Sequence, residues 1–267
     1  MLKLCALVSG SSGNCIYVGN EDTHILIDAG ITKRRAAQSL ASLDVDGNKL
    51  DGILVTHEHS DHVGGLGVIS RAFPAKIYAT RGSIEGIKEL RNLGEIPDER
   101  FCEINRGNEF QIGSLTILPI KTSHDAYESC GYRIFENNKS VAVVTDLGYY
   151  TSEMVAYLEG VNAILLESNH DILMLETGPY PYHLKQRVLG ERGHLSNENC
   201  GRLLADIMHD DLQGVLLGHL SAENNFQSLA FDTVKLILDC TVGTDRANAL
   251  NMSVAGRDIM SELLRVN

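Results

Sequence analysis

The stretch that decides the fold is Thr56-His57-Glu58-His59-Ser60-Asp61-His62, which follows the apolar run Gly52-Ile53-Leu54-Val55. Its three imidazoles and the Asp61 carboxylate lie within six residues and are ligands suited to zinc, and also usable by manganese or iron. A strand that ends in a tight loop can turn several side chains toward one point. A solvated polar loop is the alternative, but it fits poorly after a run typical of a buried strand. The stretch therefore predicts a metal site at a strand end.

The pattern His-x-His-x-Asp-His in this stretch resembles the signature of the metallo-β-lactamase superfamily. The resemblance implies an α/β fold, an αββα sandwich of two mixed β-sheets flanked by helices, with two metal ions between the sheets. Further positions of the superfamily pattern are matched, in the expected order and after short apolar runs, by Asp28, His124, Asp146 and His219.

Carried over residue by residue, the resemblance implies two ligand sets joined by one bridging carboxylate: His57, His59 and His124; Asp61, His62 and His219; and Asp146 between them. Asp28 would orient ligands without binding metal. Two divalent ions are expected, zinc or manganese with iron also feasible, and each keeps a position open for water or a substrate oxygen. Ions about 3.5–4 Å apart can generate hydroxide near neutral pH and clamp a phosphate or carbonyl oxygen.

Several branches of the superfamily fit less well. A periplasmic β-lactamase would need a signal peptide, and the apolar run over residues 1–8 is too short for one. Flavodiiron oxygen reductases typically have glutamate at the position of His59. The large β-CASP nucleases carry an inserted domain, for which 267 residues leave no space. The protruding arm by which ribonuclease Z holds transfer RNA has no counterpart, so transfer RNA maturation is not expected.

Across nearly all of its length the sequence is similar to the YycJ (WalJ)-like branch. The stretches that carry this similarity are residues 9–14, 26–31, 56–62, 167–171, 180–185, 193–197 and 217–225. This resemblance implies a DNA exonuclease that acts from 5′ ends and is linked to DNA repair or cell-wall signalling.

Four residues outside the ligand set are candidates for contact with substrate. Gly193-His194-Leu195-Ser196 resembles a segment of ribonuclease Z relatives, which implies that His194 is catalytic, together with Asp61. The turn Ser9–Asn14 reads either as a plain turn or as a loop in which Ser12 and Asn14 contact a phosphate. His170 follows a buried-strand pattern and is expected to approach the substrate.

The predicted activity is hydrolysis of phosphodiester bonds, with DNA as the substrate and a metal-activated hydroxide as the nucleophile. The net charge of −12 weakens a nucleic-acid prediction, although bound metal restores local positive charge. Two alternatives remain: a small-molecule hydrolase acting on cyclic phosphodiesters or thioesters, and a weakly catalytic, metal-bearing regulatory module. A basic track for DNA could form from Lys33, Arg34, Arg35, Lys185, Arg187 and Arg192, which read equally well as ordinary solvated charges.

Composition fits one metallo-β-lactamase-fold domain over residues 1–267. Apolar residues make up 43% of the chain, enough for buried sheets covered by helices. There is no run of about 18 apolar residues, so no membrane span is predicted and a cytoplasmic location is expected. The six cysteines form no Cys-x-x-Cys pair and are expected to be reduced and mostly buried. The oligomeric state is left open.

Periodicity predicts strands at residues 4–9, 15–18, 25–28, 53–56, 76–79, 115–120, 131–135, 140–145, 163–167, 214–217 and 251–255. Helices are predicted at residues 33–43, 66–72, 83–93, 152–159, 196–208, 229–238 and 258–264. Residues 169–193, with Gly178-Pro179-Tyr180-Pro181, are predicted to be a long irregular segment, and a loop of that length is often functional.

Overall fold

The structure, a computed structural model, describes residues 1–267 and contains two seven-stranded sheets. The first sheet has the order β14-β1-β2-β3-β4-β5-β6. Its strands are, in chain order, β1 (Leu2–Val8), β2 (Cys15–Gly19), β3 (His24–Ile27), β4 (Gly52–Leu54), β5 (Lys76–Thr80), β6 (Phe101–Ile104) and β14 (Leu264–Val266). The four strands from β3 to β6 run parallel to one another.

The second sheet has the order β13-β12-β11-β10-β9-β8-β7. Its strands are β7 (Phe110–Ile112), β8 (Leu115–Lys121), β9 (Cys130–Glu136), β10 (Lys139–Val144), β11 (Ala163–Glu167), β12 (Gly214–Gly218) and β13 (Met252–Val254). Strands β10 to β13 are parallel, whereas β7, β8 and β9 form antiparallel hairpins that lead into β10.

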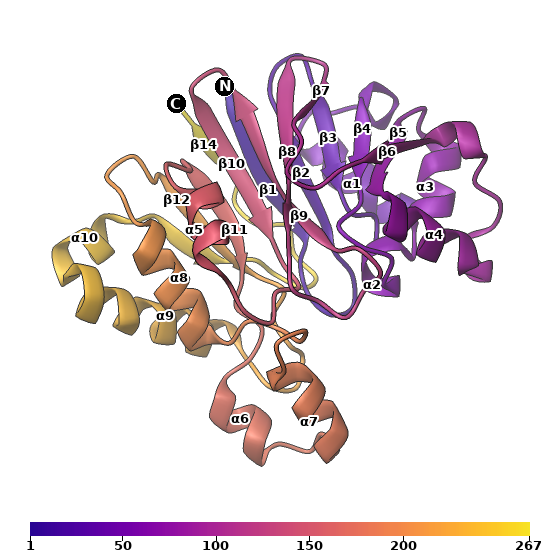
Figure 1. Ribbon diagram of the computed structural model, residues 1–267. Helices are drawn as coiled ribbons and strands as arrows, with labels where there is room; N and C mark the ends of the chain where they lie inside the picture. Colours follow the sequence, from indigo (N-terminus) through magenta and orange to yellow (C-terminus); the bar gives the residue numbers. More distant parts are fainter.

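Helices cover the outer face of each sheet (Figure 1). The first sheet is covered by α1 (Lys33–Ser42), α3 (Leu66–Ala72) and α4 (Arg81–Glu89), and the short α2 (Ser60–Val63) lies near its lower end. The second is covered by α5 (Ser152–Leu158), α8 (Asn197–Ile207), α9 (Gln227–Val242) and α10 (Thr244–Ala249). No helix combines the length and apolar character needed to cross a membrane.

The core is layered because the strands bury both of their faces. Alternate residues of β1, such as Leu2 and Leu4, point into the interface between the two sheets, where they meet Val141 and Val143 of β10. Cys5, which lies between Leu4 and Ala6, points to the other face and packs toward the helices. This explains the nearly continuous apolar runs of the strands, since a strand covered on both sides has no polar face. The predicted αββα architecture is confirmed.

The carboxyl ends of the parallel strands of both sheets lie at one edge of the sandwich, at the bottom of Figure 1. The two termini lie side by side at the opposite edge, where Leu2 of β1 pairs with Val266 of β14. Side chains that follow the strands of both sheets therefore converge at the lower edge, as is common for sites in open parallel sheets.

Two element predictions are wrong. Residues 169–193 are not one irregular segment, because they contain α6 (Ile172–Thr177) and α7 (Tyr182–Leu189), a helical hairpin that projects below the sandwich (Figure 1). The stretch from Gly178 to Pro181 separates these two helices, and Pro181 precedes the first residue of α7. Residues 258–264 form bends and the start of β14 instead of a helix, because Ser261 exchanges backbone and hydroxyl hydrogen bonds with Ala6 of β1.

Candidate metal centre

Three polar residues of the site turn away from the strands that precede them. Asp28, Asp146 and His219 follow β3, β10 and β12 within two residues, and their φ angles are 64°, 57° and 55°. Left-handed backbone is unfavourable for residues with a side chain and is concentrated at functional sites. Here it directs a carboxylate or an imidazole from the strand end into the gap between the sheets, which a continuing extended chain could not do.

The histidine-rich stretch packs tightly against the loop that follows β3. At Gly30, a Cβ atom would lie far inside van der Waals contact with the carbonyl oxygen of Asp61, and at Gly65 it would strike the carbonyl of Ile31. The backbone of Asn14 also donates to the Asp61 carbonyl at 2.7 Å. Glycine is therefore needed at Gly65 because the two segments approach each other closely. It is not needed for a left-handed backbone, since φ at Gly65 is near −98°.

The potential ligand atoms gather in overlapping groups in which they all lie within 4.8 Å of one another: His57, His59 and His124; His57, His62 and Asp146; Asp61, His62 and His219; and Asp146, Glu167, His194 and His219. Asp146 belongs to two of these groups and is almost fully buried. All the residues predicted as ligands are thus brought together, and Asp146 lies between the histidines of the two predicted sets.

Most of these imidazoles have one ring nitrogen bonded outward, which turns the other toward the centre. Nδ1 of His62 lies 2.7 Å from Asp28 Oδ2, Nδ1 of His124 lies 3.0 Å from the carbonyl of Gly193, and Nδ1 of His57 lies 3.0 Å from Thr56 Oγ1. Metal-binding histidines characteristically make such outward bonds, which fix the ring orientation and the tautomer.

The buried centre also contains polar atoms whose hydrogen-bonding capacity is not met. His57 Nε2 and Asp146 Oδ2 are buried and make no hydrogen bond, although Asp146 Oδ2 lies 3.2 Å from His62 Nε2. An unmet buried polar atom costs about 1–3 kcal/mol, so such atoms are rare unless something else binds them. Their position inside a set of imidazole and carboxylate donors fits a divalent metal ion.

Glu167, the last residue of β11, is a functional candidate that sequence reasoning missed. It is fully buried, and its Oε1 lies 2.7 Å from His194 Nδ1 and 2.9 Å from His219 Nδ1. Its Oε2 accepts the backbone N–H groups of Leu147 and Leu195. One carboxylate thus orients two imidazoles. The available signal was an acidic residue at the end of the apolar run 163–166, at the same kind of strand end as the ligands.

Without metal, charges within the centre balance each other. Burial disfavours the charged form of His219, but Asp146 and hydrogen bonds to Asp61 and Glu167 raise its pKa to about 10. Burial likewise opposes ionisation of Glu167, yet the charge and hydrogen bond of His194 lower its pKa to about 2. Burial lowers the pKa of His57 well below its usual range. The ionised Glu167 carboxylate is therefore paired with a protonated His219, whereas His57 is neutral, and a metal ion would replace the proton of His219.

The remaining predicted residues lie around this centre in different environments. The side chain of His194 is 17% exposed, and its Nδ1 is bonded to Glu167. Asn14 is buried, and its amide contacts Asp61 Oδ2 at 3.3 Å and His62 Nε2 at 3.1 Å, so it faces the ligands instead of solvent. Ser12 is exposed on the turn. His170 is buried beside Ser196, and burial lowers its pKa to about 4.

Most cations of the candidate basic track form hydrogen bonds with carboxylate or carbonyl groups of the protein itself. Arg187 lies on α7, not in a loop, and makes two hydrogen bonds to Asp125. Lys185 donates to the carbonyl of Glu176 and Arg192 to that of His124. Arg34, in the first turn of α1, is exposed and has no carboxylate partner. The contacts of Arg187 and Arg192 tie the segment before His194 to the loop that contains His124.

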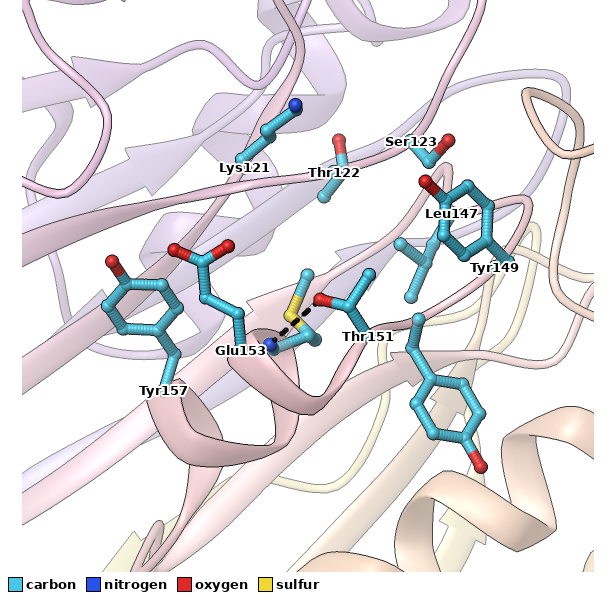
Figure 2. Close-up of a pocket in the computed structure, with 10 residues that line it drawn as sticks. Lys121, Thr122, Ser123, Leu147, Tyr149, Thr151, Glu153 and Tyr157 are labelled. Atoms are coloured by element: carbon cyan, nitrogen blue, oxygen red, sulfur yellow. Dashed lines mark hydrogen bonds between the residues drawn. The ribbon is translucent and has the colours of Figure 1, made fainter.

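A small cavity of about 80 Å³ lies beside the residues that flank His124 and Asp146 in the chain (Figure 2). Figure 2 shows Lys121, Thr122 and Ser123 on one side and Tyr149, with Glu153, on the other. Pockets that bind small ligands usually enclose about 300–1,000 Å³, so this cavity is too small for a nucleotide.

Comparisons with known proteins agree with this geometry. Residues 23–217 match the family described as the β-lactamase superfamily domain. The chain is 36% identical to exodeoxyribonuclease YycJ of Bacillus anthracis over 238 residues, which cover 89% of each chain. It is 35% identical to exodeoxyribonuclease WalJ of Streptococcus pneumoniae over 246 residues, or 91% of each chain.

Solved structures support the fold. The metallo-β-lactamase fold protein YhfI of Bacillus subtilis superposes with a TM-score of 0.69 at 18% identity, covering 98% of this chain and 100% of that one. The short form of human tRNase Z superposes with a TM-score of 0.64 at 12% identity, covering 99% of both chains. This chain therefore belongs to the β-lactamase superfamily, in the branch that contains YycJ and WalJ, and is a metal-dependent hydrolase.

Proposed function

We propose that this chain is an exodeoxyribonuclease that hydrolyses DNA phosphodiester bonds from 5′ ends with two divalent metal ions. The observation that carries the proposal is the buried set of histidine and aspartate donors around Asp146, with unpartnered atoms in its interior. The substrate class is supported by the exodeoxyribonuclease relatives, which this chain matches over about nine-tenths of their length.

The ligand sets follow the grouping of the side chains. One ion would be held by His57, His59 and His124. The other would be held by Asp61, His62 and His219, and Asp146 would contact both ions. Zinc and manganese suit this donor set, and iron is also compatible. The ions, when bound, supply Lewis acidity toward a phosphate oxygen and lower the pKa of water.

The protein's own groups keep these donors in place. Asp28 accepts from His62 and from the backbone and hydroxyl of Thr56, which holds the ring of His62 with Nε2 facing Asp61 and Asp146. Glu167 does the same for His219. Because both carboxylates are fully buried, their hydrogen bonds are shielded from competing water.

His194 is placed to move a proton. Its Nδ1 is held by Glu167, so Nε2 faces away from that carboxylate at the partly exposed edge of the centre. A protonated ring there would donate to the leaving oxygen of the cleaved bond. The helix α8 begins three residues later, and its Asn197 N–H donates to the carbonyl of His170, which helps to position the segment after His194.

The experiment is a digestion of linear DNA labelled at either the 5′ or the 3′ end, with zinc or manganese added. We expect early release of the 5′ label as mononucleotides or short fragments. The same preparation is tested on a thioester and a cyclic phosphodiester, which separates the small-molecule alternative, whereas no turnover of any substrate would favour a regulatory module.

The number of ions is tested on the bridging residue. Elemental analysis of the native protein should give about two metal ions per chain, and Asp146→Ala should remove at least one of them, because both sets share this carboxylate. Retention of both ions in the variant would contradict the ligand assignment.

A further inference from the structure

A larger cavity opens directly beside the candidate metal centre, on the side of His59. It has a volume of about 620 Å³, within the usual range for ligand pockets, and its lining includes Glu58, His59, Gly86, Glu89, Asp125 and Tyr127. It lies between α4 and the segment that follows His124. A substrate phosphate at the centre would therefore place an attached nucleotide within reach of this cavity.

Glu58 lines this cavity and has a buried carboxylate oxygen with no hydrogen-bond partner. Its side chain is fixed on one side by Gly86, where a Cβ would lie 2.5 Å from Glu58 Cγ, and on the other by the Tyr127 N–H, which donates to Oε1 at 2.9 Å. The residue is 8% exposed, and its Oε2 has no hydrogen-bond partner in the protein. A buried carboxylate oxygen without a donor is a strong acceptor for a ligand that brings one.

Tyr127 supplies a flat apolar surface at the mouth of the same cavity. It is 61% exposed, yet its hydroxyl donates to Glu89 Oε2 at 3.0 Å, which restrains the ring. The next residue, Glu128, is bound to α4 by its carboxylate, which accepts the Gly82 N–H at 2.9 Å, and by its carbonyl, which accepts from Thr80. An exposed aromatic ring on a restrained segment is the kind of platform on which nucleic-acid bases stack.

The charge of the lining decides which part of a nucleotide fits. Glu58 and Glu89 have no cationic partner, whereas Asp125 is paired with Arg187. Negative charge repels a phosphate and favours hydrogen-bond donors. The exocyclic amino groups of adenine, cytosine and guanine are such donors, whereas thymine has no amino group and offers only its ring N3–H.

We propose that this cavity holds the base of the nucleotide next to the cleaved phosphodiester bond, stacked on Tyr127 and donating an amino hydrogen bond to Glu58. The inference rests on the proposed function and adds a base subsite to it. It predicts that removal of the terminal nucleotide depends on the identity of its base, with thymine bound least well.

The first test measures equilibrium binding of short single strands with phosphorothioate linkages to the metal-loaded protein, by fluorescence anisotropy. Tyr127→Ala should weaken binding about 5- to 150-fold, the usual contribution of one stacked base. Tyr127→Phe, which keeps the ring, should bind within about threefold of the native protein on the same scale. Tyr149→Ala, an exposed tyrosine in the small cavity of Figure 2, is the matched control and should leave binding unchanged.

A strand that lacks only the terminal base separates stacking from general binding. Native protein should bind it as weakly as Tyr127→Ala binds the complete strand, and the substitution should add no further loss. The base subsite would be overturned if Tyr127→Ala weakened binding of the two strands equally, or if it weakened binding of neither strand.

The second test uses Glu58→Gln, which keeps the packing against Gly86 but removes the charge. Native protein should bind strands ending in adenine or cytosine more tightly than strands ending in thymine, and the variant should reduce that preference. An absent preference in native protein, or loss of an additional metal ion from the variant by elemental analysis, would overturn the proposal in favour of a cation site. Native protein that neither binds nor cleaves DNA would instead refute the proposed function itself.

Discussion

At the scale of single residues, function depends on how each ring is held. His194 and His219 share one carboxylate, Glu167, yet only His219 also contacts Asp61, at 3.4 Å. His194 is 17% exposed in its side chain, whereas that of His219 is 1% exposed. This difference in exposure supports the proposed roles, a metal ligand for the buried His219 and a proton donor for the accessible His194.

This difference leads to a prediction for His194→Ala. The variant should keep the native metal content, because His194 is outside the proposed ligand sets, while turnover of DNA falls by roughly 10²–10⁴-fold, the usual scale for general acid catalysis. Hydrolysis of bis-(p-nitrophenyl) phosphate should fall less, since its leaving group needs no proton. Loss of metal in the variant would make His194 a ligand, and near-native DNA cleavage would leave it a structural residue.

Thiol reactivity gives a second residue-scale prediction. Cys5, Cys15, Cys130 and Cys200 are buried, and burial raises the pKa of Cys130 to about 12, whereas Cys240 is exposed. Because the thiolate is the reactive form, iodoacetamide at pH 8 should modify Cys240 in the folded protein and spare these four. Mass spectrometry of intact and urea-unfolded samples checks this, and rapid modification of Cys130 in the folded protein would contradict the buried position.

At the scale of elements, short segments that hold the centre together have little freedom to adjust. The loop after β3 and the helix α2 approach so closely that only glycine fits at position 30. The helix α8, by contrast, is capped by the Ser196 side chain, which accepts from the Asn199 N–H within the same local segment. Substitutions at these two positions should therefore have very different costs.

We expect Gly30→Ala to destabilise the fold by about 3 kcal/mol, the upper end for overpacking, since the colliding atoms belong to the backbone. Ser196→Ala should cost about 1 kcal/mol, the usual value for a lost helix cap. Urea unfolding of both variants measures the difference. Equal costs would mean that the segment around Gly30 yields more easily than its contacts indicate.

The cations of α1 and α7 also differ in their availability to DNA. Arg34 is unpaired, whereas Arg187 is bound to Asp125. If Arg34 contacts a phosphate, Arg34→Ala should reduce the slope of the logarithm of the binding constant for single-stranded DNA against the logarithm of the salt concentration by about 0.7. Arg187→Ala should change this slope less. Binding titrations at several salt concentrations measure both slopes, and an unchanged slope for Arg34→Ala would make it an ordinary surface charge.

At the scale of the whole molecule, the centre joins the two sheets at one edge. His57 and His62 follow the first sheet, while Asp146 and His219 follow the second. Ions bound between these residues would link the two halves of the sandwich, and a ligand that binds only the folded state stabilises it.

Metal removal should therefore lower the melting temperature. At a free metal concentration of about 100 times the Kd, binding contributes about 2.7 kcal/mol, or about 5–10 °C for a chain of this size. Calorimetry before and after EDTA treatment measures the shift, and Asp146→Ala is the control that should respond less. An unchanged melting temperature would show that metal binding does not couple the sheets.

The sequence by itself predicted the sandwich and the candidate ligands, because His-x-His-x-Asp-His and the positions of Asp28, His124, Asp146 and His219 resemble the metallo-β-lactamase pattern. Apolar runs before Asp28, Asp146 and His219 also predicted that these three residues follow strands. The predicted bounds of α1 and α3 agree closely with the structure, since apolar spacing is a local signal.

Only the tertiary structure decided the partners of Glu167, the pairing of Arg187 with Asp125, and the cavity between Glu58 and Tyr127. These contacts join residues distant in the chain, and their distances depend on how the sheets and helices pack. The irregular backbone at 258–263 has the same cause, because the hydrogen bonds of Ser261 to Ala6 of β1 override local helical preference. Periodicity reports which face of an element is buried, but not which distant side chain it meets there.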